Sequence, residues 1–121
     1  MEAGPRILIA DDDADMRSWL KAALAAIDAR VSEAATGWQL LDALADGPTV
    51  DLVITDVFMP LPNGMSAAGM ARAAGIRVPI IILTASLDER LRAGAEQLAD
   101  TVLLRKPITP RELVDCVLGR L

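Results

Sequence analysis

The chain has 121 residues, a formal net charge of −5, 53% hydrophobic residues and no histidine. This length suits one domain, residues 1–121, with a core of its own. The acidic excess disfavours a nucleic-acid surface, because phosphates repel it. The lack of histidine excludes histidine-based catalysis and most zinc sites.

No apolar run approaches the roughly 20 residues of a membrane span. The first six residues lack the charged-then-apolar pattern of a secretory signal. The single cysteine, Cys116, cannot form an internal disulfide, and we expect it to be inert packing on a helix. We therefore expect a reduced, cytoplasmic setting without membrane contact.

Apolar strands alternate with helical patterns from the first residues onward. Residues 6–10 are an apolar run that ends in three aspartates, which predicts a buried strand. Residues 15–27 carry apolar side chains at helical spacing, with Asp13 as the expected N-cap. Residues 30–34 predict a weak strand at a sheet edge. Thr36, three residues before Gln39, then opens a second helix with capping-box spacing.

The middle of the chain is organised around a strand that ends in Asp56. Residues 51–56 are mainly apolar or β-branched, and Pro60 soon stops the strand. Residues 65–74 predict a third helix. Residues 78–83 are the most apolar run in the chain and predict a fourth strand.

The last third repeats the pattern. Ser86, three residues before Glu89, predicts a capping box for a fourth helix that reaches about residue 98. Residues 101–105 predict a fifth strand. Thr109, followed by proline at the first helical position, predicts the start of the last helix.

This order indicates an α/β fold with a doubly wound, five-stranded parallel sheet and five helices. The carboxyl ends of parallel strands share one rim, where ligands bind in open α/β sheets. The residues that end the strands there are Asp11, Asp12, Asp56, Thr84 and Lys106. Three carboxylates, a hydroxyl and an ammonium suit Mg²⁺-assisted phosphoryl transfer to a carboxylate. Asp56 is the expected nucleophile, and Lys106 and Thr84 would each contact a phosphoryl oxygen.

These motifs resemble the receiver domain of two-component response regulators. The resemblance spans essentially the whole chain and depends on residues 7–12, residues 51–60 with Gly64, residues 83–85, and Lys106-Pro107. It implies a CheY-like, flavodoxin-like strand order 2-1-3-4-5 and a cis Lys106–Pro107 bond. It also implies that Asp56 forms an aspartyl phosphate with a group from a histidine kinase or a histidine phosphotransfer protein. The implied Mg²⁺ ligands are Asp12 with Asp11 nearby, Asp56 and the backbone carbonyl of Phe58.

The resemblance further implies a phosphorelay signalling protein of bacterial type that catalyses only its own phosphorylation and dephosphorylation. Phosphorylation would alter binding of a downstream protein through the face of the fourth helix, fifth strand and fifth helix. The chain would be a monomer or a phosphorylation-dependent dimer, and either a stand-alone receiver or one cut from a larger protein. The family has an aromatic switch residue where this chain has Leu103, so we expect an atypical switch.

Two alternatives stay open at this level. The first is a receiver-like interaction module that docks partners without phosphorylation, which the missing aromatic favours and the complete acidic pocket disfavours. The second is a haloacid-dehalogenase-like phosphatase with Asp11 as nucleophile and Asp13 as acid, although no late acidic pair follows Lys106.

The two tryptophans and the phenylalanine have less specific expectations. Trp19 and Trp38 occupy helical positions that suit the core or a partly covered surface. Phe58 either screens the site from water or is a simple loop hydrophobe, and by resemblance its position tunes dephosphorylation.

Overall fold

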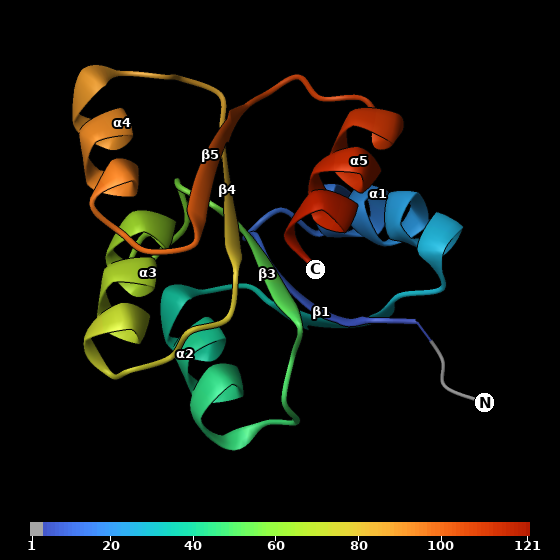
Figure 1. Cartoon of the computed structure of the whole chain (residues 1–121), viewed down its shortest axis with the longest axis horizontal. Coiled ribbons are helices and arrows are strands. Elements are labelled where there is room, and N and C mark those ends of the chain that lie inside the picture. The colour runs from blue at the N-terminus through green and yellow to red at the C-terminus, as the bar shows by residue number, and fades with distance from the viewer. Residues whose placement is uncertain (1–3) are drawn as a thin grey trace.

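The computed structural model describes residues 4–121, so part of the opening segment that was examined for a secretory signal lies outside it. The strands are β1 (Arg6–Ala10), β2 (Arg30–Ala34), β3 (Leu52–Asp56), β4 (Ile80–Thr84) and β5 (Thr101–Arg105). The α-helices are α1 (Ala14–Leu24), α2 (Gly37–Asp46), α3 (Gly64–Ala73), α4 (Glu89–Glu96) and α5 (Pro110–Arg120), with a 3₁₀ helix, η1 (Ala25–Ile27), after α1. Figure 1 shows their arrangement around the sheet.

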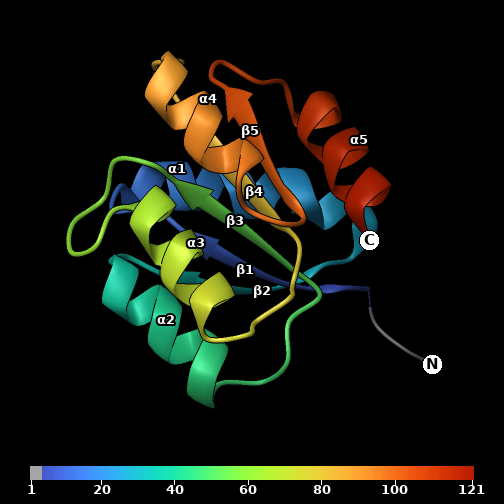
Figure 2. The ribbon, with the colours of Figure 1, turned by 60° about the vertical axis from the view of Figure 1, so that its left-hand side comes forward.

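All strands are parallel and lie in the order β2-β1-β3-β4-β5, which confirms the expected sheet. The strand arrows of β1, β3, β4 and β5 point to a common rim (Figure 2). The order reverses between β1 and β3, so the loops that leave these two strands depart toward opposite faces. Such a reversal opens the crevice in which α/β sheets bind ligands.

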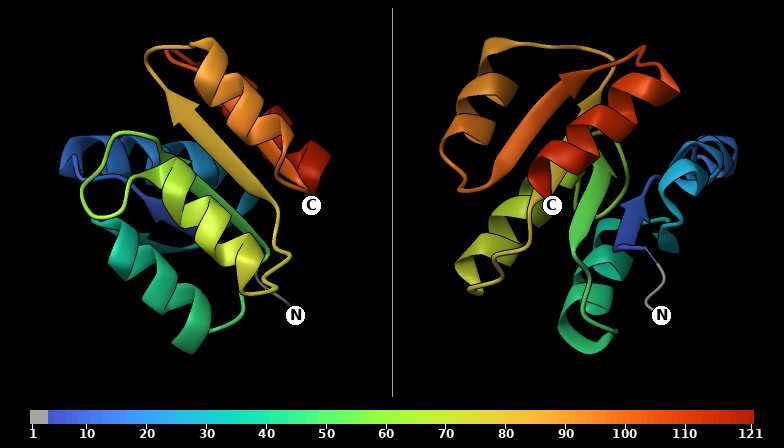
Figure 3. Two further views of the ribbon diagram at one scale, coloured as in Figure 1. Left: turned by 90° about the vertical axis from the view of Figure 1, so that its left-hand side faces the viewer. Right: turned by 45° about the vertical axis from the view of Figure 1, so that its right-hand side comes forward.

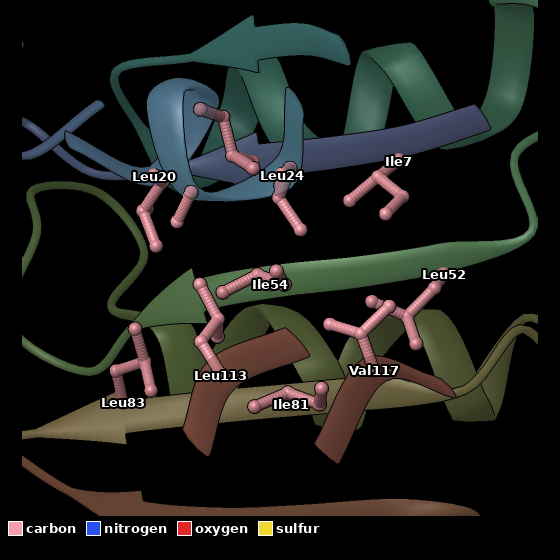
Figure 4. Packing of buried hydrophobic residues seen from close by; sticks show 11 residues of the cluster. Ile7, Leu20, Leu24, Leu52, Ile54, Ile81, Leu83, Leu113 and Val117 are labelled. Carbon is pink, nitrogen blue, oxygen red and sulfur yellow. The ribbon is translucent and has the colours of Figure 1, made fainter. Parts of the chain in front are cut away.

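Helices cover both faces of the sheet, and each face has its own core (Figure 3). Side chains alternate along a strand, so Ile7 and Ile9 face one cluster while Leu8 and Ala10 face the other. In the first cluster, Leu20 and Leu24 of α1 and Leu113 and Val117 of α5 meet the strands (Figure 4). In the second, α2, α3 and α4 pack on the opposite face. Every residue of β3 and β4 is buried, which places their last residues at the edge of a dry core.

The expected helix at residues 15–27 is correct in type but is divided. The α-helix ends at Leu24, and η1 tightens the last turn before Asp28 takes a left-handed φ of 54°. Asp13 caps α1 by accepting a hydrogen bond from the Asp15 amide, as predicted.

The predicted capping box at Ser86 is wrong. Asp88 is the N-cap of α4, and its carboxylate accepts from the Leu91 amide at 2.9 Å. Ser86 is held in the preceding loop, because its amide donates to the Thr84 hydroxyl and its carbonyl accepts from that hydroxyl. The helix therefore starts later than its sequence spacing indicates, and it ends at Glu96 rather than near residue 98.

The other caps follow the sequence more closely. Thr109 and Glu112 form the complete capping box at the start of α5. Thr36 caps α2, but the Gln39 side chain accepts from the Ala35 amide instead of the Thr36 amide. The Lys106–Pro107 bond is cis, as the resemblance implied, and the Leu61–Pro62 bond is also cis, which was not expected.

The aromatic residues differ in burial. Trp19 packs against the first cluster, whereas Trp38 is 55% exposed and is therefore not a core residue. Phe58 is 59% exposed at the rim. Cys116 packs against the first cluster, and burial raises the pKa of its thiol, in agreement with a packing role. Within residues 4–121, none of the helices is both long and apolar enough to cross a membrane.

Candidate functional site

Asp56 lies at the end of the fully buried strand β3. Its backbone pairs with Leu83 of β4, and the next residue continues the pairing through a hydrogen bond from the Val57 amide to the Leu83 carbonyl at 3.0 Å. The Asp56 carbonyl accepts from the Thr55 hydroxyl. Asp56 is only 8% exposed, so its carboxylate projects from a fixed backbone position and has limited access to water.

The start of α3 lies directly against the backbone of Asp56. The Gly64 amide donates to the Val57 carbonyl at 2.9 Å, and a Cβ at this position would collide with the Asp56 carbonyl oxygen. Only glycine permits this close approach without a shift of the backbone. Gly64 therefore has a steric role, because its lack of a side chain lets α3 begin next to the end of β3.

The acidic residues after β1 have different environments. The Asp11 amide donates to the Ala34 carbonyl of β2, and the Asp11 carboxylate accepts from the Asp13 amide at 2.9 Å. Asp11 is buried, at 2% exposed, while Asp12 is exposed. Asp13 turns away to cap α1, which places it outside the acidic cluster.

Three carboxylates converge at the rim. Oxygens of Asp11, Asp12 and Asp56 all lie within 4.8 Å of one another. Lys106 follows β5 and places its Nζ 3.2 Å from Asp56 Oδ1 and 3.8 Å from Asp11 Oδ2. The cluster therefore holds three carboxylates and one ammonium, which pairs with two of them, so its formal charge is negative.

The surroundings of Asp11 disfavour the charged form of its carboxyl. Burial raises the pKa of its carboxyl, and the nearby carboxylates of Asp56 and Asp12 raise it further. The Asp13 amide and Lys106 oppose this rise but do not cancel it. A cation placed among the three carboxylates would relieve the same repulsion.

Lys106 is held by its backbone and by apolar neighbours. Its amide donates to the Thr84 carbonyl at 2.7 Å, which extends the β4–β5 pairing to the rim. Its side chain lines a cavity of about 330 Å³ together with Met16, Trp19, Pro107 and Ile108. The aliphatic stem can thus pack on apolar surface while the ammonium meets the carboxylates.

Thr84 and Phe58 are at the rim without contacting the acidic cluster. The Thr84 hydroxyl donates to the Ser86 carbonyl at 2.8 Å, so in this state it is engaged in a local turn. Phe58 directs an exposed side chain to solvent. Within residues 4–121, its carbonyl accepts no hydrogen bond, so that oxygen has no competing donor.

The donor set fits a hard divalent cation. Carboxylate and carbonyl oxygens are the ligands that Mg²⁺ takes in proteins, usually with several waters retained. Asp11, Asp12 and Asp56 supply the carboxylates at suitable mutual distances, and the exposure of Asp12 leaves room for water. The residues present therefore suit Mg²⁺.

One residue beside this cluster has no signal in the sequence. Arg17 of α1 donates from Nη1 to the Asp11 carbonyl at 2.7 Å and from Nε to Glu33 at 3.0 Å. No periodicity or motif spacing distinguishes Arg17 from the other arginines, because its partner is a backbone atom.

Comparison with known proteins agrees with the fold. The family model described as the response regulator receiver domain matches residues 7–118. The transcriptional regulatory protein CpxR of Escherichia coli K12 is 38% identical over 109 residues, which cover 90% of this chain and 46% of CpxR. PrrA of Mycobacterium tuberculosis, also a transcriptional regulatory protein, is 35% identical over 112 residues, covering 91% of this chain and 47% of PrrA.

A third relative is of another kind. The sensor histidine kinase TmoS of Ectopseudomonas mendocina is 34% identical over 113 residues, which cover 90% of this chain and 11% of TmoS. The chain thus spans less than half the length of these curated relatives.

Solved structures show the same architecture. The receiver domain of the Francisella response regulator 1452 superposes with a TM-score of 0.87 at 26% identity and covers 96% of this chain and 95% of that one. The chemotaxis response regulator CheY4 of Vibrio cholerae gives 0.86 at 26% identity, with 98% and 99% covered.

Fold and site together define a CheY-like signalling domain of two-component systems, a class that is distinct from classical enzymes. The chain belongs to the response regulator receiver domain family.

Proposed function

We propose that this receiver domain accepts a phosphoryl group on Asp56 from a histidine kinase or a histidine phosphotransfer protein. The observation that carries the proposal is the convergence of three carboxylates and Lys106 at the carboxyl rim of the sheet. Asp56 ends the central strand β3, so its pairing with β4 fixes the backbone of the proposed acceptor.

In the proposed reaction, a carboxylate oxygen of Asp56 attacks the phosphorus of a phosphohistidine. The new O–P bond forms as the P–N bond breaks, and the imidazole leaves with the electron pair. Asp11, Asp12, Asp56 and the Phe58 carbonyl would hold Mg²⁺, which would supply charge neutralisation to the phosphoryl oxygens when bound. Lys106 is already 3.2 Å from Asp56 and would pair with another phosphoryl oxygen.

Thr84 would act after transfer. Its hydroxyl would leave the Ser86 carbonyl and donate to a phosphoryl oxygen, which would release the turn before α4. This exchange offers a route from the site to the α4 side of the sheet. We expect this exchange on phosphorylation, since the Thr84 hydroxyl now bonds only within the local turn and is close to the site.

The expected readout is altered partner binding through α4, β5 and α5. Leu103 is paired with Ile82 of β4 and packs against the second core cluster. It also lines a cavity of about 270 Å³ between α4 and β5, whose other residues include Leu87, Ala95 and Val102. We propose that the switch works by repacking around this cavity, since no aromatic ring is available at position 103.

The relatives represent two settings for such a domain. They include transcriptional regulatory proteins and a sensor histidine kinase, so both a response regulator and a kinase-attached receiver are represented. The phosphatase alternative is less well supported, because Asp13, the acid that it needs, caps α1. A receiver-like interaction module remains the second candidate, and only phosphorylation separates it from the first.

The decisive experiment is intact-mass measurement after incubation with acetyl phosphate and Mg²⁺. We expect one added phosphoryl group on the wild type, and none with Asp56→Asn or with EDTA. An adduct that persists in Asp56→Asn would assign another acceptor. If neither acetyl phosphate nor a beryllofluoride complex modifies the site, the interaction module is the better description.

The atypical switch has its own test. Amide NMR spectra with and without beryllofluoride would map the response. We expect the largest shifts at Thr84, Leu87 and Ala95, and smaller shifts at Leu103, whose backbone stays paired with Ile82 of β4. Large concerted shifts centred on Leu103 would show an ordinary switch instead.

A further inference from the structure

The guanidinium of Arg17 connects the acidic pocket to the edge of the sheet. Its Nη1 donates to the carbonyl oxygen of Asp11 at 2.7 Å, in a half-buried contact. Its Nε donates to the Glu33 carboxylate on β2 at 3.0 Å. Neither bond goes to a carboxylate of the acidic cluster, so Arg17 contacts the pocket only through the backbone.

The carbonyl that Arg17 contacts belongs to the peptide between Asp11 and Asp12. This peptide is planar, so its orientation sets the direction in which the chain leaves Asp11 and reaches Asp12. The other side of Asp11 is also fixed, because its amide donates to the Ala34 carbonyl at 3.0 Å. Asp12 itself is exposed, so the peptide before it supplies much of its restraint.

Arg17 is in turn anchored at its outer end. Glu33 accepts from Arg17 and, through its other oxygen, from Lys21 at 3.2 Å. The hydrogen bond from Lys21, with a smaller effect of Arg17, lowers the pKa of Glu33 and keeps this carboxyl ionised. The Arg17 side chain is only 19% exposed, whereas that of Lys21 is 50% exposed.

Resting on the proposed function, we propose that Arg17 is a positioning residue for the Mg²⁺ pocket: it locks the Asp11–Asp12 peptide and so holds the Asp12 carboxylate toward Asp11 and Asp56. A surface ion pair with Glu33 alone would add little to stability and nothing to the pocket. The short charge-assisted bond to a carbonyl is stronger and is directed at the turn that carries both carboxylates. Residues that orient metal ligands typically change metal affinity by about 10–100-fold.

The test is an NMR titration of ¹⁵N-labelled protein with Mg²⁺, for wild type, Arg17→Gln, Glu33→Gln and Lys21→Gln. We expect Arg17→Gln to raise the Mg²⁺ dissociation constant about tenfold and Glu33→Gln to raise it by a smaller factor. Lys21→Gln is the matched control, because it removes the other cation on Glu33 but no contact with Asp11. It should leave the dissociation constant within about twofold of the wild type.

A second readout separates positioning from general structural damage. Since the chemistry itself does not use Arg17, the initial phosphorylation rate of Arg17→Gln with acetyl phosphate should return to the wild-type value at saturating Mg²⁺. A rate that stays low at saturation, or an equal loss of affinity in Lys21→Gln, would overturn the inference. If Arg17→Gln does not fold, Arg17→Lys replaces it, and it should raise the dissociation constant above the wild-type value, because one ammonium cannot reproduce the guanidinium contacts with both Asp11 and Glu33.

The two proposals can fail separately. Wild-type protein that binds Mg²⁺ while Arg17→Gln binds it equally well would overturn the role of Arg17 and leave the receiver function intact. Wild-type protein that binds no Mg²⁺ would overturn both.

Discussion

Lys106 Nζ lies 0.6 Å closer to Asp56 than to Asp11, at 3.2 Å against 3.8 Å, so one ammonium serves carboxylates on two neighbouring strands with a bias toward the proposed acceptor. Replacing it by methionine keeps the apolar stem and removes the charge. We expect Lys106→Met to lower the initial rate of phosphorylation by acetyl phosphate about 100-fold, because a fixed charge on the transferring group is lost. The rate is followed by intact mass over time.

The control for this prediction is Lys21→Met, which removes an exposed ammonium that pairs with Glu33 and not with the carboxylates of Asp11 and Asp56. It should phosphorylate like the wild type. A Lys106→Met protein within about threefold of the wild-type rate would mean that Lys106 is a structural lysine, since loss of one preorganised contact normally costs far more.

Asp11 should cost the protein stability when no cation is present. Because the folded protein raises the pKa of this carboxyl above its ordinary value of 3.8, the native state binds more protons than the unfolded chain between the two values. Stability from this group therefore falls as pH rises through that window and stays low above it. In EDTA at neutral pH, Asp11→Asn should raise the free energy of unfolding by about 1 kcal/mol.

Urea unfolding in EDTA at several pH values checks both parts. Asp11→Asn should also flatten the decline of stability with rising pH, whereas Asp115→Asn, at an exposed position of α5, should keep the wild-type slope. Equal pH profiles for Asp11→Asn and the wild type would contradict the raised pKa.

Two glycines of the same helix should respond oppositely to alanine. Gly64 opens α3 against the Asp56 carbonyl, and a methyl group there must displace backbone, at a cost of about 2 kcal/mol. Gly69 lies inside α3 with nothing within 4 Å of a new Cβ, so Gly69→Ala should stabilise the protein by about 1 kcal/mol. Chemical unfolding measures the change in the free energy of unfolding for both variants. A Gly64→Ala protein as stable as the wild type would refute the close approach.

Arg72 should be a major stabilising residue at the opposite end of the sheet. Its guanidinium donates to the carbonyls of Ile76, Val78, Ala99 and Asp100 and to the Thr101 hydroxyl. We expect Arg72→Met to lower the free energy of unfolding by about 3 kcal/mol, because several carbonyls lose their donor. Phosphorylation by acetyl phosphate should continue at temperatures where the variant is folded.

Arg77→Met is the matched control for Arg72, since Arg77 is an exposed arginine on the adjoining loop. It should change stability by less than about 0.5 kcal/mol. Arg72→Lys should recover only part of the loss, because an ammonium cannot reproduce the fork of donors. Equal unfolding curves for Arg72→Met and Arg77→Met would refute this role.

The sheet and the acidic rim could be predicted because each depends on local order along the chain. Residues 52–56 and 80–84 are strands in the structure, and their apolar runs are typical of parallel strands that are buried on both faces. Because parallel strands end at the same rim of the sheet, their last residues lie close together. The capping box of Thr109 was predictable for the same reason, since all its groups lie within four residues.

Other features depend on partners that sequence spacing does not reveal. Ser86 and Asp88 both suit an N-cap, and the choice of Asp88 follows from the Thr84 hydroxyl that holds Ser86 in a turn. Arg17 and Arg72 bind carbonyl oxygens, which every residue possesses, so no residue type marks their targets. Trp38 has an apolar helical pattern around it but lies at the solvent side of α2.

The Arg72 contacts join the loops that precede β4 and β5, whereas the acidic cluster lies beyond the opposite ends of the strands. The contacts that stabilise the fold through Arg72 and the proposed phosphorylation site are thus separated by the length of the sheet. Substitutions in the rim loops leave the Arg72 contacts intact, whereas substitutions at the Arg72 end of the sheet lower the stability of the fold. Such a division lets the residues of the acidic rim be replaced while the fold persists.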